Sequence, residues 1–458
     1  MREFRRFEDY IFEAMSKTGL PGLSAAAVDR DGVIWSRGFG FRNVEAGLPA
    51  TPHTVYGIGS ITKSFTAIAV LQLWEEGKLS LDDPVGKFLP LELEVKGKPV
   101  RLWHLLTHSA GIPALAYAEA FIRAATGAAT GWVPTATTDD IVIFMAGAEE
   151  WALEPPGTRW FYLNEGYALL GKVIEVVSGL DYREYVRRRI LEPLGLESAC
   201  FLEELEETPE PAAPYLITPA GRRERSSVPK GPIAADGGLA MSALDLARYA
   251  RMYLGRGELD GARVLSPGAV SEMEVPRVPV PYRGPFGEEG YGYGLWIIPD
   301  FLGRRVIGHG GSVLVYTAHM AYIPEEGIGI VLLANASGPR LAQLALYGLA
   351  LMLDADPEAL PFVIHGRAVE ELPGVYEAFR GTMRVEVRPL GEMLIISIKD
   401  KHSEQLIPLV PEDLSGGVKR FYTLQNGRKL PVEFLVDGEG VRLVYERYCF
   451  RRVGPLPR

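Results

Sequence analysis

The order of hydrophobic and polar positions predicts a chain in which strands and helices follow each other. Residues 23–39 hold two mainly apolar runs on either side of Asp31-Gly32, a pattern typical of a β-hairpin. From Ser60 to Glu76 the apolar positions recur with a helical period, and Gly77 stands where that helix should end. The remaining expectations are helices in most of 100–235, over Ser242–Leu254 and about Leu341–Leu353, and strands over Tyr291–Ile298, Arg304–His309, Tyr316–Ile323 and Gly329–Ala334. This succession predicts an α+β fold on one antiparallel sheet.

A second pattern begins after a Pro- and Glu-bearing stretch at Asp354–Pro373. Beyond it the chain alternates between apolar and polar residues, as half-buried strands do, and Asn426-Gly427 and Asp437-Gly438 are pairs typical of tight hairpin turns. We therefore expect a small C-terminal β-barrel. We expect a first domain over 1–355, which is large enough for a catalytic domain, a linker over 356–372 and the barrel domain over 373–458.

The N-terminal stretch is charged throughout and has an amphipathic pattern. Phe7, Ile11 and Met15 recur at i, i+4 spacing, which predicts a surface helix. A signal peptide would need a continuous apolar core, and a membrane span about 18 continuous apolar residues; neither is seen in the sequence. We therefore expect a cytoplasmic protein that does not interact with membranes.

Composition narrows the class of protein further. The chain has 48 basic and 58 acidic side chains, and this net charge of -10 argues against a nucleic-acid partner. The two cysteines, Cys200 and Cys449, exclude a disulfide framework and an iron–sulfur cluster, while leaving open whether they pair with each other. Asn and Gln together number only eight, a depletion that favours a thermophilic origin.

Several common catalytic and cofactor signatures are absent, among them G-x-S-x-G, H-E-x-x-H, C-x-x-C and G-x-G-x-x-G. Gly166–Lys172 has the spacing of a phosphate loop, but Val173 stands where a magnesium-binding Ser or Thr belongs, and no strand precedes the segment. The histidines are scattered without the spacing of metal ligands. We therefore expect neither a metal nor another cofactor.

The chain contains two S-x-x-K sequences. Ser227-Val-Pro-Lys230 lies in a Ser-, Pro- and Gly-rich stretch, so its side chains have no defined spatial relation. Ser60-Ile-Thr-Lys63 stands at the first turn of the predicted helix, where residues i and i+3 share a face. A lysine placed there can take the proton of the serine, and the helix N-terminus can stabilise an oxyanion. The alternative is that Ser60 caps the helix and Lys63 is solvated.

Two further motifs complete a recognisable set. Tyr162-Leu-Asn164 is the only Y-x-N sequence in the chain, 102 residues after Ser60, and His309-Gly-Gly-Ser312 follows a predicted strand. In this order, the three motifs resemble those of the serine β-lactamase and penicillin-binding-protein superfamily, closest to class C β-lactamases, D-amino-acid peptidases and their esterase relatives. The resemblance covers roughly residues 5–355 and includes the flanking phrases Leu105–Ile112, Pro156-Gly157 and Gly237–Ser242. It implies a β-lactamase-like sheet flanked by helices, with an all-helical region.

The resemblance also implies a role for each motif residue. Ser60 would be the nucleophile that forms an acyl-enzyme, and Lys63 and Tyr162 would share the proton transfers, leaving open which of them is the base. Asn164 would orient Lys63, and the backbone N–H groups of Ser60 and Ser312 would form the oxyanion hole. The residues that it assigns to substrate binding are Asn164, His309, Gly311 and Ser312.

One residue departs from the usual pattern of this superfamily. His309 stands where β-lactamases and D-Ala-D-Ala carboxypeptidases have a lysine that pairs with the substrate carboxylate. A histidine is only partly charged near neutral pH, so a substrate with a free carboxylate is less expected. We expect a serine peptidase or amidase for small peptides, including peptides with D-residues. The alternatives are a carboxylesterase, a weak β-lactamase, and an inactive relative that binds peptide or peptidoglycan fragments.

The C-terminal domain resembles the lipocalin-like barrels that follow some peptidases of this superfamily. Such a domain would wall the active-site cleft, form a homo-oligomer contact, or act only as a stabilising module. The sequence leaves these alternatives open.

Overall fold

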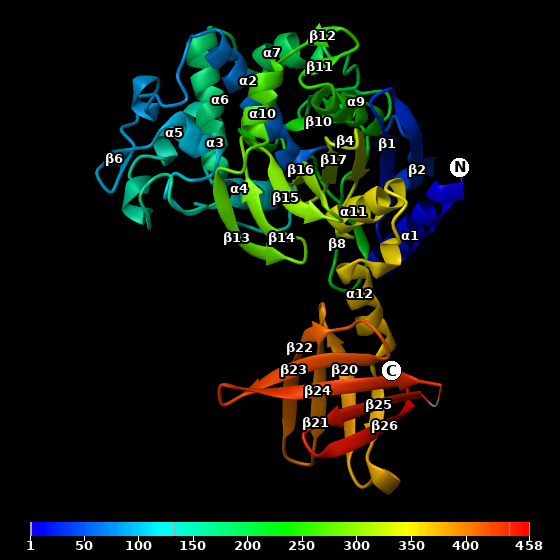
Figure 1. Cartoon of the computed structure of the whole chain (residues 1–458). Helices are drawn as coiled ribbons and strands as arrows, with labels where there is room; N and C mark the ends of the chain where they lie inside the picture. The colour runs from blue at the N-terminus through cyan, green and yellow to red at the C-terminus, as the bar shows by residue number, and fades with distance from the viewer. Residues whose placement is uncertain (1, 132, 439, 458) are drawn as a thin grey trace. The chain divides into compact units, whose positions relative to one another are not determined.

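A computed structural model describes residues 2–131, 133–438 and 440–457. Figure 1 shows its helices and strands in chain order. The chain divides into two compact units, Met1–Asp354 and Ala355–Arg458. The segment 356–372, where the composition predicts a linker, contains the helix α12 (Pro361–Glu371) and belongs to the second unit.

An antiparallel sheet of nine strands organises the first unit, in the order β13-β14-β15-β16-β17-β18-β1-β2-β3. The predicted hairpin is present: β1 pairs with β2 across the Asp31-Gly32 turn, and β1 also pairs with β18, which follows it by some 300 residues of chain. The strands are β1 (Gly22–Val28), β2 (Val33–Asn43), β3 (Leu48–Pro49), β13 (Val278–Gly284), β14 (Gly287–Tyr291), β15 (Trp296–Phe301), β16 (Arg304–Ser312), β17 (Thr317–Ile323) and β18 (Ile328–Ala334).

The predicted strand Tyr291–Ile298 is wrong as a continuous element. β14 ends at Tyr291 and β15 begins at Trp296, and between them the N–H of Gly292 donates to the carbonyl of Leu295. Gly294 in this turn has a φ of +71°, and a Cβ there would lie 2.9 Å from the carbonyl oxygen of Lys63. The chain therefore leaves the sheet to pack against the helix that carries Lys63, a contact between distant segments that periodicity does not reveal.

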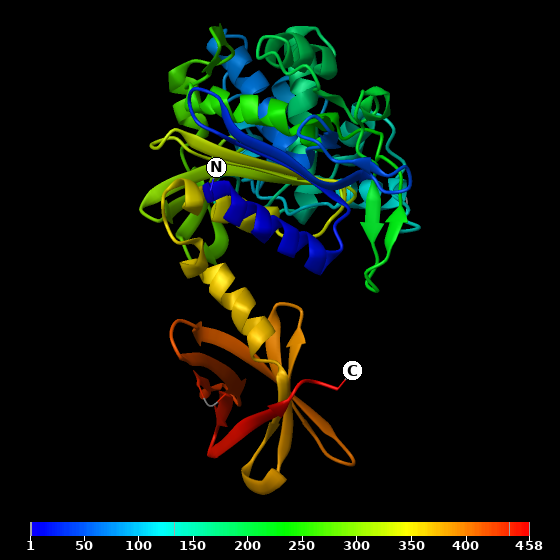
Figure 2. The same cartoon turned by 90° about the vertical axis from the view of Figure 1, so that its right-hand side faces the viewer.

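Helices cover both faces of the sheet. Figure 2 shows α1 (Arg2–Thr18) and α11 (Leu341–Met352), in blue and yellow, on one face, and α9 (Ala243–Leu254), in green, on the other. As the spacing predicts, α1 buries Phe7, Ile11 and Met15. Among the described residues, no helix has both the length and the apolar character of a membrane span.

The central helix α2 (Thr62–Glu75) carries the S-x-x-K lysine. Residues 62–73 of this helix are all buried, so it lies inside the helical region rather than on its surface. It packs against α6 (Asn164–Ser178) and α8 (Ala234–Gly237). The other helices and helical turns of this unit are η1 (Gly59–Ile61), η2 (Val85–Lys87), α3 (Leu102–Leu106), α4 (Tyr117–Ala125), α5 (Thr138–Phe144), η3 (Ala148–Trp151), α7 (Tyr182–Val186), η4 (Arg187–Leu191), η5 (Leu205–Glu207) and α10 (Pro267–Met273).

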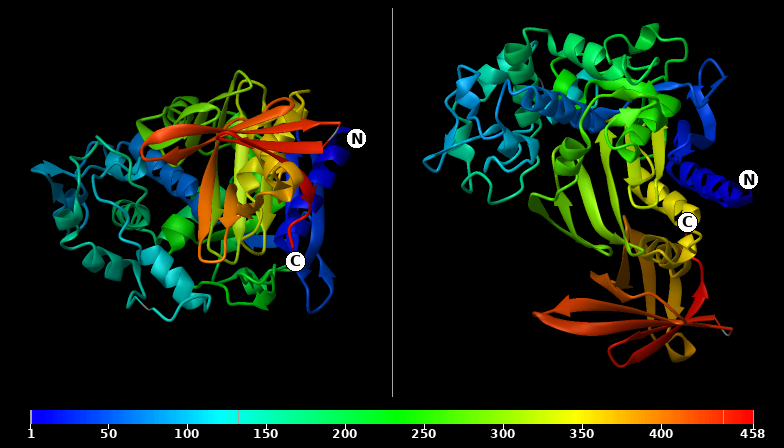
Figure 3. Two further views of the ribbon diagram at one scale, coloured as in Figure 1. Left: turned by 90° about the horizontal axis from the view of Figure 1, so that it is seen from below. Right: turned by 45° about the horizontal axis from the view of Figure 1, so that its top comes forward.

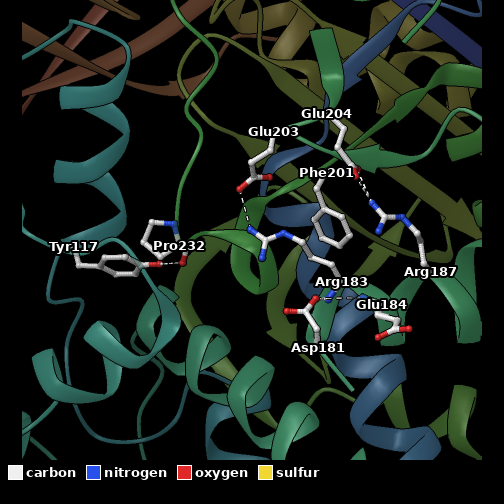
Figure 4. A network of polar contacts seen from close by, with 9 residues as sticks. All are labelled: Tyr117, Asp181, Arg183, Glu184, Arg187, Phe201, Glu203, Glu204 and Pro232. Atoms are coloured by element: carbon white, nitrogen blue, oxygen red, sulfur yellow. Dashed lines mark hydrogen bonds and ion pairs between the residues drawn. The ribbon is translucent and has the colours of Figure 1, made fainter. Parts of the chain in front are cut away.

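Short strands also lie among the helices of the first unit, and those within 100–235 interrupt the stretch that the sequence predicts to be mostly helical. The short strands are β4 (Val55–Gly57), β7 (Cys200–Phe201) and β10 (Leu239–Ser242), which form one small sheet, and the paired strands β5 (Glu94–Val95) with β6 (Lys98–Pro99), β8 (Tyr215–Ile217) with β9 (Arg223–Arg225), and β11 (Glu258–Leu259) with β12 (Ala262–Arg263). Figure 4 shows how β7 is attached to α7 and η4: Arg183 and Arg187 lie on the ring of Phe201 and pair with Glu203 and Glu204. These contacts join the helical region to the small sheet.

The second unit contains a closed barrel of eight strands that follow each other in chain order (Figures 1 and 3). Its strands are β19 (Gly374–Glu377), β20 (Arg384–Leu390), β21 (Met393–Lys399), β22 (Glu404–Asp413), β23 (Val418–Gln425), β24 (Arg428–Asp437), β25 (Gly440–Tyr445) and β26 (Tyr448–Gly454); short helical turns lie at η6 (Pro357–Ala359) and η7 (Phe379–Gly381). Asn426-Gly427 forms the predicted tight turn, and both residues have positive φ. Val387, Ile396 and Phe434 are among the side chains packed inside. This confirms the predicted C-terminal β-barrel.

Candidate active site

Ser60 lies in the turn η1, where two glycines allow the backbone of β16 to approach. A Cβ on Gly59 would lie 2.5 Å from the backbone nitrogen of Ser312. A Cβ on Gly311 would lie 1.8 Å from the carbonyl oxygen of Ile58 and 2.9 Å from the nitrogen of Ser60. Only glycine fits this contact, which brings the backbone of Ser312 against the turn that carries the Ser60 hydroxyl.

Lys63 follows on the first turn of α2, and its side chain is fully buried. Its Nζ donates to the hydroxyl of Ser60 at 3.1 Å, to Oδ1 of Asn164 at 2.8 Å and to the carbonyl of Asp236 at 2.6 Å. These three contacts surround the amine and fix its position. The lysine is therefore held in one direction, toward the serine, and the solvated alternative for Lys63 is wrong.

Tyr162 and Asn164 approach from the start of α6. Asn164 is the first residue of this helix and is buried, with Oδ1 accepting from Lys63 and Nδ2 donating to Glu119 at 3.1 Å. The Tyr162 ring lies beside Lys63, with 4.9 Å between the ring centroid and Nζ. The Y-x-N motif thus meets the S-x-x-K motif over an interval of about a hundred residues of sequence.

His309 is buried on β16, and its ring nitrogens both have partners. Nδ1 lies 2.5 Å from the carbonyl oxygen of Gly310, which can only accept, so Nδ1 carries the proton. Nε2 is then the acceptor for the hydroxyl of Tyr291, at 2.8 Å. Burial lowers the pKa of His309 to about 3. The imidazole is neutral near pH 7 and presents no positive charge to a substrate.

One cavity of about 590 Å³ joins these residues. The predicted site residues on its wall are Ser60, Tyr162, Asn164, His309, Gly311 and Ser312, and Lys63 lies behind it. Besides Asp236, two charged residues line the cavity: Glu119, from α4, and Arg340, which precedes α11. Figure 1 places α4 and α11 on opposite sides of β16. Sequence reasoning missed both charges, since neither lies in or beside a recognised motif.

Asp236 and Glu165 are two buried acids near Lys63 that sequence reasoning also missed. The Glu165 carboxylate accepts from the backbone N–H of Tyr117 at 3.1 Å, and the Tyr117 hydroxyl donates to the carbonyl of Pro232 at 2.9 Å (Figure 4) and lies 3.4 Å from the Asp236 carboxyl. Burial raises the pKa of Asp236 to about 7 and also raises the pKa of Glu165. In the sequence, the only signal for these two acids is their position. Glu165 follows Asn164 of the Y-x-N motif, and Asp236 precedes the recognised phrase Gly237–Ser242.

The segments that sequence reasoning set aside lie outside this cavity. Gly166–Lys172 is part of α6, and Lys172 pairs with Asp139 at 2.7 Å. Ser227–Lys230 has no regular structure, and Lys230 pairs with Glu206. Cys200 is a buried free thiol and Cys449 an exposed one. Within residues 2–131, 133–438 and 440–457, no group of three His, Cys, Asp or Glu side chains could hold a metal ion.

Comparison with known proteins agrees with this arrangement. A family model described as beta-lactamase matches residues 7–352. The chain belongs to the β-lactamase family. A second model, described as the Pab87 octamerisation domain, matches residues 357–451.

Three relatives show how far the β-lactamase-family likeness extends. The structure of the octameric penicillin-binding protein homologue from Pyrococcus abyssi is 45% identical, with a TM-score of 0.92, and the match covers 97% of this chain and 99% of that one. A D-stereospecific amidohydrolase from Streptomyces sp. is 30% identical, with a TM-score of 0.60, over 75% of this chain and 97% of that one. Penicillin-binding protein 4 from Amycolatopsis lactamdurans is 29% identical, over 69% of this chain and 81% of its own length. The β-lactamase-family unit thus has hydrolases among its relatives.

Proposed function

We propose that this chain is a serine hydrolase that forms an acyl-enzyme on Ser60 and cleaves amide bonds in small peptides. The observation that carries the proposal is the contact between Lys63 Nζ and the Ser60 hydroxyl, in a site where Asn164 and the carbonyl of Asp236 hold the lysine. Ser60 attacks the scissile carbonyl, and its proton passes to the unprotonated member of the Lys63 and Tyr162 pair, a neutral amine or a phenolate, which returns it to the leaving amine. Water then releases the acyl group by the reverse transfers.

The oxyanion formed in this attack needs donors close to Ser60. We assign this role to the backbone N–H groups of Ser60 and Ser312, which the glycine contact between η1 and β16 brings together. Asn164 keeps Lys63 oriented and faces the cavity, where a substrate amide would lie. This arrangement takes residues from all three sequence motifs.

The charges of the cavity favour substrates with a free amino group. His309 lies beside the nucleophile and is neutral. It therefore offers no positive charge to a substrate carboxylate next to the scissile bond. Glu119 is exposed in the cavity and hydrogen-bonded to Asn164, which places a carboxylate where a substrate ammonium group would be stabilised. Arg340, toward α11, suits the distant carboxylate of a short peptide. The 30% identical D-stereospecific amidohydrolase supports D-residues among the substrates.

Labelling and substrate comparison test this function. A fluorophosphonate should add one phosphonyl group to Ser60, detected by mass spectrometry, and Ser60→Ala should remove both labelling and turnover; a folded wild-type protein without label would contradict the enzyme assignment. L- and D-amino-acid p-nitroanilides should be cleaved faster than their N-acetylated forms. Glu119→Gln should raise KM by about tenfold for the free amines alone. Turnover of p-nitrophenyl esters without any amide cleavage would establish an esterase instead.

We also propose that the chain forms a homo-oligomer through its second unit. The support is the match of residues 357–451 to the octamerisation-domain model, together with the octameric state named for the Pyrococcus abyssi homologue. The barrel exposes large apolar side chains, which include Leu390, Leu406 and Leu424. Such side chains are expected in a contact between copies.

A further inference from the structure

His108 holds the segment of Tyr162 by two hydrogen bonds, one on each side of the tyrosine. The carbonyl of His108 accepts from the N–H of Phe161 at 2.8 Å, and its Nδ1 accepts from the N–H of Leu163 at 3.0 Å. The imidazole ring packs against the tyrosine ring itself, with 4.1 Å between the centroids. The histidine thus defines the backbone before and after Tyr162 and also supports its ring.

The hydrogen bond from Leu163 determines the tautomer of His108. Because Nδ1 accepts, the proton of the neutral ring lies on Nε2. Nε2 is buried and has no hydrogen-bond partner among the described residues. The rings around the imidazole are those of Tyr167, Tyr291 and Trp160, with centroids 5.1, 4.9 and 6.1 Å away. Burial lowers the pKa of His108 well below its ordinary value of 6.5, so the ring stays neutral.

The backbone of His108 is strained as well. Its φ is +56°, in the left-handed region, where a histidine is less favourable than glycine or asparagine. A strained backbone and an unpaired buried N–H are two costs to stability at one residue. Such costs persist at positions whose conformation serves the site, and His108 touches the tyrosine of the proposed proton pair.

We propose that His108 is a positioning residue that holds the Tyr162 hydroxyl in line with Lys63 and Ser60 for proton transfer. This inference rests on the proposed function. His108 itself is absent from the cavity wall, whereas Tyr162, whose ring it packs against, lines the cavity. Loss of the ring would leave substrate binding intact and let the tyrosine move, and displacements of about 1 Å lower rates by up to about a hundredfold.

Two substitutions test the proposal on the full chain. His108→Asn keeps an acceptor for Leu163 and tolerates positive φ, but removes the ring behind Tyr162; we expect kcat to fall about tenfold to a hundredfold, KM to change less than twofold, and Tm to change little. His108→Gly also tolerates this backbone and leaves a ring-sized space; imidazole in the buffer should raise its kcat at least about fivefold. Imidazole should not affect the wild type.

His104→Asn is the matched control. His104 is also buried, and its Nδ1 also accepts a backbone N–H, from Arg101 at 2.9 Å, but it does not pack on Tyr162. We expect its kcat within about twofold of wild type. Full kcat in His108→Asn, or an equal kcat loss in both Asn variants, would overturn the positioning role. If the wild type is active, either result contradicts this inference alone. If the wild type shows no Ser60-dependent turnover, the proposed function and the inference are both overturned.

Discussion

The side-chain nitrogen of Lys63 lies 3.1 Å from the hydroxyl oxygen of Ser60, one helical turn away. The same nitrogen is held by Asn164 and by the carbonyl of Asp236, so its direction does not depend on the serine. The pair is therefore preorganised before any substrate enters, and this reduces the reorganisation that proton transfer requires.

Lys63→Met should remove most activity while preserving the fold. The unbranched methionine fills a similar volume, but it neither accepts nor donates the serine proton, so kcat/KM should fall by about 10² to 10⁴. Steady-state kinetics with an amino-acid p-nitroanilide measure this, and Tm checks folding. Lys230→Met, in the second S-x-x-K sequence, is the control; equal losses in both variants would speak against a specific role of Lys63.

Gly311→Ala should be far more harmful than Gly310→Ala next to it. A Cβ on Gly311 would lie 1.8 Å from the carbonyl oxygen of Ile58, whereas the nearest atom to a Cβ on Gly310 is His319 Nδ1, at 3.3 Å. Overpacking of this kind costs about 1–3 kcal/mol, and it would separate Ser312 from Ser60. We expect Gly311→Ala to lose about a hundredfold in kcat or more. Similar kinetics for both alanine variants would contradict the assigned oxyanion hole.

Asp236 should make stability depend on pH. Burial raises the pKa of this carboxyl from 3.8 to about 7, so the folded chain binds a proton that the unfolded chain releases. Its contribution to stability is complete below pH 3.8 and is lost as pH rises through 7. The Tm of the wild type should therefore fall relative to that of Asp236→Asn by at least about 2 °C over this range. Calorimetry at several pH values measures the difference, and a constant difference would contradict the prediction.

Removal of the second unit should lower the oligomeric state. If the barrel forms the contacts between copies, the assembly of a chain that ends at Asp354 should have a lower mass than the assembly of the full chain. The difference should exceed the mass of the missing barrels. Size-exclusion chromatography with light scattering measures this for both chains. Turnover of a p-nitroanilide should persist, because all motif residues lie before Asp354. A shortened chain that keeps the full assembly would assign the contacts to the first unit.

The sequence by itself was enough for features that depend on local order. The hairpin at 23–39, the helix that carries Lys63 and the tight turn at Asn426-Gly427 follow from periodicity and turn chemistry, because their defining contacts join residues close in the chain. The three motifs could be recognised for the same reason, since each is a short run of residues. Predictions were wrong at Tyr291–Ile298, where packing against α2 interrupts the alternation.

Only the tertiary structure decided how these local features act together. Lys63 contacts Asn164 and Asp236, which lie far from it in the sequence. Glu119 lines the same cavity although it belongs to no recognised motif. The state of His309 depends on Tyr291 and on burial, neither of which the sequence shows. Charge, tautomer and direction of a side chain are set by the groups packed around it, and that packing exists only once the sheet and the helical region have formed.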